Sequence, residues 1–150
     1  QQPQWVRNKK VLELGAGIGL PSFSIADLAA QLIISDLAPE AVSLIEKNIH
    51  FLSLENARAI CIDWNDFPEN INAEVLLLSD INYAPSQFQT LLNLINLFLA
   101  SHTTIILATP QRITITPFAE ALQPYIIRSV VQSVNHLGQL VEIRLLILSK

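Results

Sequence analysis

Positive charge is scarce in this sequence, which has nine Lys and Arg residues against thirteen Asp and Glu residues and a formal net charge of −4. Proteins that bind nucleic acid normally carry a basic excess, because they must neutralise phosphates. The composition therefore argues against a nucleic-acid substrate. Histidine is also rare, and the three histidines lack the spacing of metal ligands, so we expect no metal site.

The sequence has one cysteine, no methionine and no long apolar run. The single cysteine, Cys61, cannot form an intrachain disulfide, and its apolar neighbours predict a small buried thiol in a reducing cytoplasm. Asn93 and Asn96 interrupt the apolar stretch 91–100, which falls short of the roughly 18 residues needed to cross a bilayer. We therefore expect a cytoplasmic protein with no membrane partner. Because Gln1 is not a methionine, we also expect an N-terminal segment to be missing.

The sequence does contain a regular alternation of short apolar runs with segments of helical spacing. Strands are expected at 10–14, 32–36, 57–62, 74–79 and 103–109. Helices are expected at 21–29, 39–52, 86–99 and 117–123, the third opened by a capping box of Ser86 and Gln89. Two further β-rich segments, 125–134 and 140–148, flank a turn at Leu137-Gly138 and must pair antiparallel.

This order of elements predicts an α/β fold in one domain, residues 1–150. Strands that alternate with helices form a doubly wound, Rossmann-like and mostly parallel sheet, and the last two strands add a C-terminal antiparallel hairpin. The length is that of a single domain with one substantial core.

Three of the four glycines, Gly15, Gly17 and Gly19, lie directly between the first expected strand and the first helix. Glycines there allow backbone conformations closed to other residues and let a ligand approach the main chain. The alternative is a tight turn with no ligand. The dinucleotide pattern G-x-G-x-x-G is incomplete, because Leu20 occupies the place of its last glycine. This weakens an NAD-binding interpretation without removing it.

Asp36 ends the second expected strand, seventeen residues after Gly19. In a doubly wound sheet this position lies at the carboxyl edge beside the glycine loop, where a carboxylate can accept both hydroxyls of a ribose. The alternative is an ordinary helix-capping aspartate. The ribose interpretation suits a nicotinamide cofactor and an adenosyl cofactor equally.

The stretch Val11-Leu12-Glu13-Leu14-Gly15-Ala16-Gly17-Ile18-Gly19-Leu20 resembles the first motif of the seven-β-strand (class I) S-adenosylmethionine (SAM) dependent methyltransferases. The resemblance extends over nearly all of the chain. It implies a seven-stranded sheet of order 3-2-1-4-5-7-6, SAM as cofactor and S-adenosyl-L-homocysteine as product. The cofactor-binding residues that it implies are Glu13, Gly15, Ala16, Gly17, Gly19, Asp36, Leu37, Asp63, Trp64, Ser79 and Asp80.

The resemblance also gives Glu13, Asp63 and Trp64 particular roles, and discrimination from the NAD-binding interpretation comes from the two residues that follow the third strand. By the resemblance, Glu13 organises the glycine loop, and Asp63 with Trp64 forms the adenine site, the carboxylate accepting from the exocyclic amine and apolar groups flanking the ring. The alternative for Asp63 and Trp64 is a solvated aspartate beside a core tryptophan.

Ser79-Asp80-Ile81-Asn82-Tyr83 follows the fourth strand and, together with 108–112, resembles the protein-lysine methyltransferase-like branch, which carries Asp-x-x-Tyr here. Branches that methylate nucleic-acid bases usually have two prolines where this chain has Ile81 and Asn82. We expect Asp80 to orient the attacking amine and Tyr83 to line its pocket as the catalytic pair. Alternatively, Asp80 caps the following turn and Tyr83 packs. Arg112 either binds substrate or is solvated.

Three hypotheses follow from these observations. The leading one is a SAM-dependent N-methyltransferase acting on a protein lysine or a small amine. The second is an NAD-binding Rossmann module, and the third is a catalytically silent methyltransferase-fold interaction domain. Members of the family usually have an N-terminal segment that closes over the cofactor, which is the segment expected to be missing.

Overall fold

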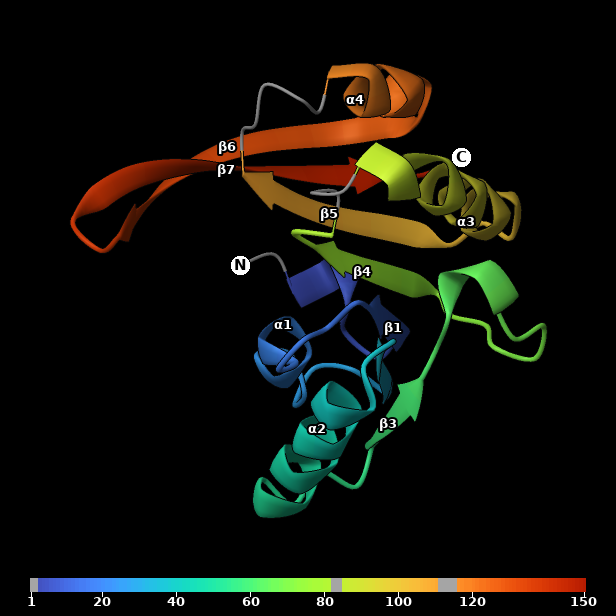
Figure 1. Ribbon diagram of the computed structural model, residues 1–150, viewed down its shortest axis with the longest axis vertical. Helices are drawn as coiled ribbons and strands as arrows, with labels where there is room; N and C mark the ends of the chain where they lie inside the picture. The colour runs from blue at the N-terminus through green and yellow to red at the C-terminus, as the bar shows by residue number, and fades with distance from the viewer. Residues whose placement is uncertain (1–2, 82–84, 111–115) are drawn as a thin grey trace. The chain divides into compact units, whose positions relative to one another are not determined.

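A computed structural model describes residues 3–81, 85–110 and 116–150 (Figure 1). The strands are β1 Lys10–Leu14, β2 Gln31–Asp36, β3 Ala57–Cys61, β4 Val75–Ser79, β5 Thr104–Pro110, β6 Ile126–His136 and β7 Gln139–Leu148. The α-helices are α1 Leu20–Phe23, α2 Pro39–Phe51, α3 Phe88–Ala100 and α4 Thr116–Leu122. Single turns of 3-10 helix occur at η1 Pro3–Trp5, η2 Trp64–Asp66, η3 Pro85–Gln87 and η5 Gln123–Tyr125.

The strands form a seven-stranded sheet in the order β3-β2-β1-β4-β5-β7-β6. β1 pairs in parallel with β2 and β4, and β2 pairs in parallel with β3, whereas β7 pairs antiparallel with both β5 and β6. The expected fold class and strand order are thus confirmed. Contacts divide the chain into two compact units, residues 1–78 and 79–150, and the division falls inside β4.

The first unit is built on the buried strands β1 and β2. The apolar residues of β1, β2 and β4 are almost completely buried. Strands that are covered on both faces need apolar residues at nearly every position, and this explains their continuous apolar runs. α2 lies along β2 and β3 and buries Ile45 (Figure 1). Because β1, β2 and β3 are parallel, their carboxyl ends meet at one edge, and the residues that follow them are candidates for a common site.

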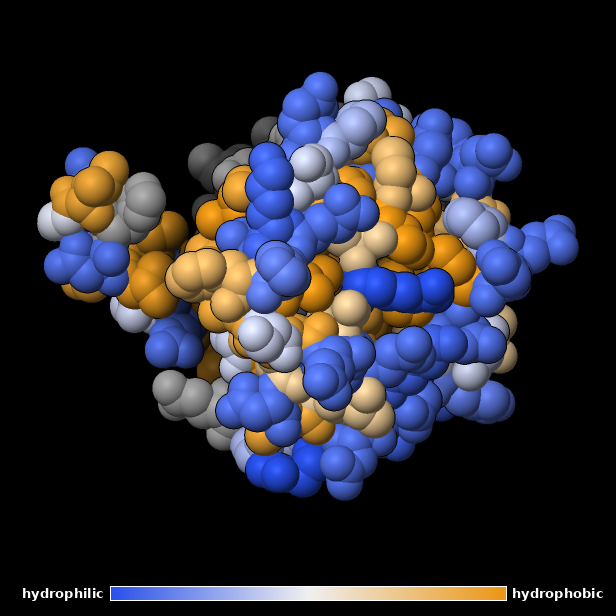
Figure 2. All heavy atoms as spheres, turned by 90° about the horizontal axis from the view of Figure 1, so that it is seen from below, coloured by the Kyte–Doolittle hydropathy of each residue, from blue (hydrophilic) through white to orange (hydrophobic). Residues whose placement is uncertain are grey.

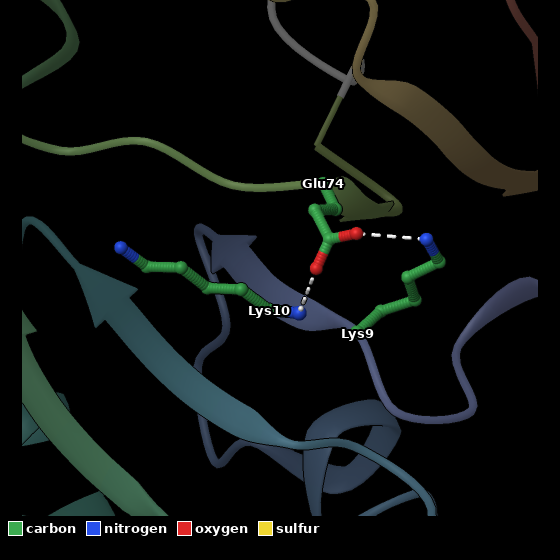
Figure 3. A network of polar contacts seen from close by, with 3 residues as sticks. All are labelled: Lys9, Lys10 and Glu74. Atoms are coloured by element: carbon green, nitrogen blue, oxygen red, sulfur yellow. Dashed lines mark hydrogen bonds and ion pairs between the residues drawn. The ribbon is translucent and has the colours of Figure 1, made fainter.

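A polar network fixes the opposite edge of this unit, where β1 begins (Figure 3). Glu74 accepts a hydrogen bond from Lys9 Nζ at 2.7 Å and another from the Lys10 backbone N–H at 3.0 Å, and the Lys10 carbonyl accepts from the Glu74 N–H at 2.9 Å. Bonding to Lys9 and Lys10 lowers the pKa of Glu74. The network sets the register in which β4 joins β1, although an exposed ion pair of this kind contributes at most about 1 kcal/mol.

The second unit contains β5, β7 and β6 with helices α3 and α4. The rings of Phe88 and Phe118 pack with their centroids 5.3 Å apart and join these helices. β6 and β7 form a long hairpin closed by Leu137-Gly138. Its exposed apolar side chains are Ile127, Val130, Val131, Val134, Leu137, Leu140 and Leu145. Orange, hydrophobic atoms are visible in the lobe at the left of Figure 2.

Two expected helix features are wrong. The helix expected at 21–29 ends at Phe23, and 24–28 continues as turns, because the Ser24 hydroxyl bonds the Pro21 carbonyl and backbone bonds such as Leu28 N–H to Ile25 O span only three residues. The capping box at Ser86 does not form. That serine lies in η3, and α3 begins after Gln87 with no side-chain cap.

Cys61 is exposed, so the expected buried thiol is also wrong. It ends the edge strand β3, whose side chains are only partly covered, and its Sγ lies 3.2 Å from the carbonyl oxygen of Leu37. Within the described ranges, no helix is both long and apolar enough to cross a membrane.

Candidate cofactor site

The loop between β1 and α1 takes its shape from three glycines with left-handed backbone. Gly15, Gly17 and Gly19 have φ values of 63°, 57° and 77°, a region that residues with a Cβ seldom adopt. Within the loop, the Gly19 N–H donates to the Ala16 carbonyl at 2.8 Å. The Ala16 N–H donates across to the Ser35 carbonyl of β2 at 2.9 Å, so the loop is held against the carboxyl end of β2.

Gly17 and Gly19 are needed for different reasons. A Cβ on Gly19 would lie 3.0 Å from the Phe23 ring and 3.4 Å from Ile34, so this glycine permits close packing of α1 on β2. A Cβ on Gly17 would meet no protein atom within 4 Å, so the backbone of Gly17 faces open space. Gly19 therefore serves the fold, and Gly17 leaves main chain accessible to a ligand.

Asp36 is held beside this loop by its own carboxylate. One oxygen accepts the Gly17 N–H at 2.8 Å, and the other accepts the Ala38 N–H at 2.9 Å, ahead of α2. Asp36 is therefore not the N-cap of α2, which is Ala38 without a side-chain cap, but its carboxylate holds both the loop and that N-cap residue. Each carboxylate oxygen has a second acceptor position, so Asp36 can still accept ribose hydroxyls, and that role stays a prediction. Leu37 follows with its side chain 60% exposed.

Glu13 lies beneath the loop rather than on its surface, with an exposed fraction of 1%. Its Oε2 accepts the Ser22 N–H of α1 at 3.2 Å, while the Ser35 hydroxyl donates to its backbone carbonyl at 2.7 Å. Burial raises the pKa of Glu13 to about 7, an effect that hydrogen bonding from Ser22 opposes. A side chain that joins β1 to α1 in this way supports an organising role in the loop.

Asp63 and Trp64, the expected adenine residues, follow β3 at the same edge. Asp63 caps η2, since its Oδ1 accepts the backbone and side-chain N–H groups of Asn65 at 2.8 Å and 3.0 Å. Trp64 is half-buried. A capping role is thus present for Asp63, and contact of either residue with an adenine stays a prediction.

Ser79 and Asp80 belong to the second unit. Asp80 is exposed and has φ of 50°, and its N–H donates to the Ala108 carbonyl at 2.8 Å. A left-handed aspartate that is fixed by its backbone is the kind of constrained residue that often serves function. Tyr83 and Arg112 lie outside the described residues.

Sequence reasoning overlooked several residues that the structure brings to the glycine loop. Ser22 and Ser35 are fully buried polar side chains around Glu13, and a serine inside the apolar run 32–36 was the available signal. Ile18 and Leu20, on either side of Gly19, are 50% and 64% exposed and add apolar surface to the loop. Among residues 3–81, 85–110 and 116–150, no three His, Cys, Asp or Glu side chains gather as a metal site would require.

Solved structures of low sequence identity share this fold. The N-methyltransferase NodS from Bradyrhizobium japonicum WM9 in complex with S-adenosyl-L-homocysteine superposes with a TM-score of 0.73 at 12% identity, covering 93% of this chain and 78% of that one. TrmN from Thermus thermophilus superposes with a TM-score of 0.75 at 17% identity, covering 96% and 44%. The fold is therefore that of the class I methyltransferases.

The chain belongs to the lysine methyltransferase family, whose sequence model matches residues 1–124. It is 36% identical over 112 residues to EEF1A lysine methyltransferase 3 of Mus musculus, which covers 71% of this chain and 47% of that protein. It is 33% identical over 123 residues to protein-lysine N-methyltransferase EFM2 of Saccharomyces cerevisiae, covering 71% and 29%. The chain thus spans half or less of the length of these relatives. The membership confirms the expected resemblance and disfavours the NAD-binding alternative.

Proposed function

We propose that this chain binds SAM and transfers its methyl group to an amine, chiefly the side-chain amine of a lysine in a protein. The single observation that carries this proposal is the glycine loop, in which Gly17 presents open backbone while its N–H anchors the Asp36 carboxylate at 2.8 Å. Membership of the lysine methyltransferase family supports the acceptor.

The residues of the first unit fit the three chemical parts of SAM. Open main chain at Gly17 suits the polar methionine part, and the spare acceptor positions of Asp36 suit the ribose hydroxyls. The exposed apolar side chains Leu37 and Ile18, with half-buried Trp64, supply surface for the adenine. The described residues therefore provide complementary groups for each part.

When bound, SAM supplies a methyl group on a positively charged sulfur, open to in-line attack. The chain's own contribution is to position the attacking amine, because alignment supplies much of the rate of such a displacement. A lysine amine with a solution pKa of about 10.4 must first lose its proton. That proton leaves to solvent before the attack, and we assign Asp80 the orienting role: its carboxylate accepts a hydrogen bond from the neutral amine and directs the lone pair, while Tyr83 lines the pocket.

The placement of Asp80 in the chain supports this assignment. It directly follows β4 and lies three residues before Tyr83, in the Asp-x-x-Tyr spacing of the lysine methyltransferase-like branch.

We also propose a cytoplasmic location. Cys61 is exposed and forms no disulfide, which suits a reducing compartment.

Calorimetric titration with S-adenosyl-L-homocysteine tests the cofactor part. Asp36→Ala should weaken binding at least tenfold, about 1.4 kcal/mol, whereas Asp27→Ala should leave it unchanged. Asp27 is an exposed carboxylate of the same unit whose loss changes the net charge equally. Equal affinity of wild type and Asp36→Ala would contradict the ribose role.

Transfer from isotope-labelled SAM into a cell extract, followed by mass spectrometry of the labelled peptides, tests the reaction. Methyl-lysine is expected, and Asp80→Ala should abolish it with little change in cofactor affinity. Binding without any transfer would instead favour the silent-domain alternative.

Arginine is a second candidate acceptor. The histone-arginine methyltransferase METTL23 of Mus musculus is 27% identical over 90 residues, covering 56% of this chain and 36% of that protein. Label found on methyl-arginine in the same experiment would select it.

A further inference from the structure

The glycine loop lies over a buried polar cluster of Glu13, Ser22 and Ser35, with exposed fractions of 1%, 0% and 0%. Glu13 Oε2 accepts the Ser22 N–H at 3.2 Å, but Glu13 Oε1 and the Ser22 hydroxyl oxygen are both buried without a well-formed hydrogen bond. Buried polar atoms without partners are rare in folded proteins and call for an explanation. Here the two atoms belong to residues that are already joined by the hydrogen bond from the Ser22 N–H to Glu13 Oε2.

Either protonation state of Glu13 can satisfy both atoms. A neutral Glu13 has an O–H that can donate to the Ser22 hydroxyl oxygen, whereas an ionised Glu13 can accept from the Ser22 hydroxyl, which rotates to suit. The Ser22 N–H serves either state. The cluster is therefore able to hold the carboxyl in two charge states without displacing β1 or α1.

The surroundings favour the neutral state in the free protein. Burial raises the pKa of Glu13 to about 7, and the opposing causes are hydrogen bonds from Ser22, with no charged group among them. Of the elements packed against Glu13, α1 and β4 have no titratable side chain, and β2 has only Asp36, whose carboxylate faces the Gly17 and Ala38 amides. On β1 itself the other titratable residue is Lys10, at the far end of the strand.

We propose that Glu13 is a buried charge sensor of the glycine loop, partly protonated near neutral pH while the loop is empty and releasing that proton to solvent when a cationic ligand binds there. The inference rests on the proposed function, since the cation is the sulfonium of SAM. A positive charge stabilises the ionised carboxylate across low-dielectric protein. S-adenosyl-L-homocysteine, a thioether without that charge, should draw out less of the proton. Glu13 would thus act through the glycine loop as a positioning residue that makes the binding of SAM stronger than that of S-adenosyl-L-homocysteine.

Calorimetry at pH 7 in two buffers of different ionisation enthalpy tests the proposal by counting protons released on binding. Wild type should release up to about half a proton more with SAM than with S-adenosyl-L-homocysteine, because a group with a pKa near 7 is half protonated there. Glu13→Gln should show no difference between the ligands. Glu46→Gln, which removes an exposed carboxylate from α2, should behave as wild type. The amino group common to both ligands cancels in the comparison.

The affinities carry the same signature. Between pH 6 and pH 8, the preference of wild type for SAM over S-adenosyl-L-homocysteine should rise by about fivefold if the cation lowers the pKa of Glu13 by one unit, and by at most about tenfold for any larger shift. In case Glu13→Gln does not fold, carbon-13 NMR of glutamate-labelled wild type should show one carboxyl titrating near pH 7 that shifts to lower pH with SAM.

Equal proton release by wild type and Glu13→Gln, or a glutamate signal unmoved by SAM, would overturn the sensor and leave the proposed function standing. If neither ligand binds wild type at all, both proposals fail together.

Discussion

Gly17 and Glu13 show how single residues serve the glycine loop in opposite ways, one by leaving space and the other by filling it with a buried carboxyl. Gly17 has left-handed backbone and open surroundings, so a glycine is needed there for its backbone conformation and for space to admit a ligand. Glu13 is enclosed, so its state is set by burial and by Ser22. Both sites allow matched substitutions.

Gly17→Ala should destabilise the fold by about 1 kcal/mol, because an L-residue in the left-handed region is strained, and should also weaken S-adenosyl-L-homocysteine binding about tenfold or more. Gly138→Ala is the matched control. Its φ is 82° and a Cβ there likewise meets nothing within 4 Å, but it lies in the hairpin turn. The control should lose similar stability in urea titrations and keep full affinity. Equal binding losses in both variants would contradict a ligand beside Gly17.

Glu13→Gln should change how stability depends on pH. Burial raises the pKa of Glu13 from its ordinary value of 4.5 to about 7, so below pH 4.5 the carboxyl is protonated in both folded and unfolded chains and costs nothing. As pH rises from 4.5 to 7, the unfolded chain ionises first, and wild type should lose about 3 kcal/mol of stability relative to Glu13→Gln. Urea denaturation at pH 5 and pH 8 measures this. A pH-independent difference between the two proteins would refute it.

At the scale of the elements, the β6–β7 hairpin combines a long ladder, irregular only between Ile126 and Arg128, with a poorly suited turn residue. The ladder runs from Ile126↔Leu148 to His136↔Gln139, and the two turn residues, Leu137 and Gly138, have φ of 50° and 82°, as in a type I′ turn. Asn135 Oδ1 accepts the Gly138 N–H at 2.9 Å and stabilises the turn. Leucine is unfavourable at the first turn position, since the side chain is 92% exposed and the backbone is left-handed.

Leu137→Asn should therefore stabilise the protein by about 0.5–1 kcal/mol, because asparagine tolerates this conformation and completes the preferred Asn-Gly turn. Thermal unfolding followed by circular dichroism checks the shift. Leu140→Asn, an equally polar change at another exposed hairpin leucine outside the turn, should give no gain. A loss of stability in Leu137→Asn would mean that the leucine makes contacts that its exposure does not suggest.

For the molecule as a whole, the number of folding units remains a prediction. The sequence predicts one domain, and contacts divide the chain at 78/79, inside β4. A strand shared by two units is broken if either unfolds alone, so we expect a single cooperative transition.

Two probes can test this cooperativity. Both tryptophans, Trp5 and Trp64, lie in the first unit, whereas far-UV circular dichroism reports all helices and strands. The two signals should give one midpoint in urea. A fluorescence transition separated from the dichroism transition would show two independent domains.

The sequence by itself determined the alternation of strands and helices, the strand order by way of the family motif, and the glycine loop with Asp36. These follow from local patterns, since buried parallel strands must be apolar and left-handed turns require glycine. Only the tertiary structure decided that Cys61 is exposed at an edge strand, that the helix after Gly19 ends at Phe23, and that Glu13 is enclosed with Ser22. Burial and hydrogen-bond partners arise from residues distant in sequence, and no local pattern specifies them.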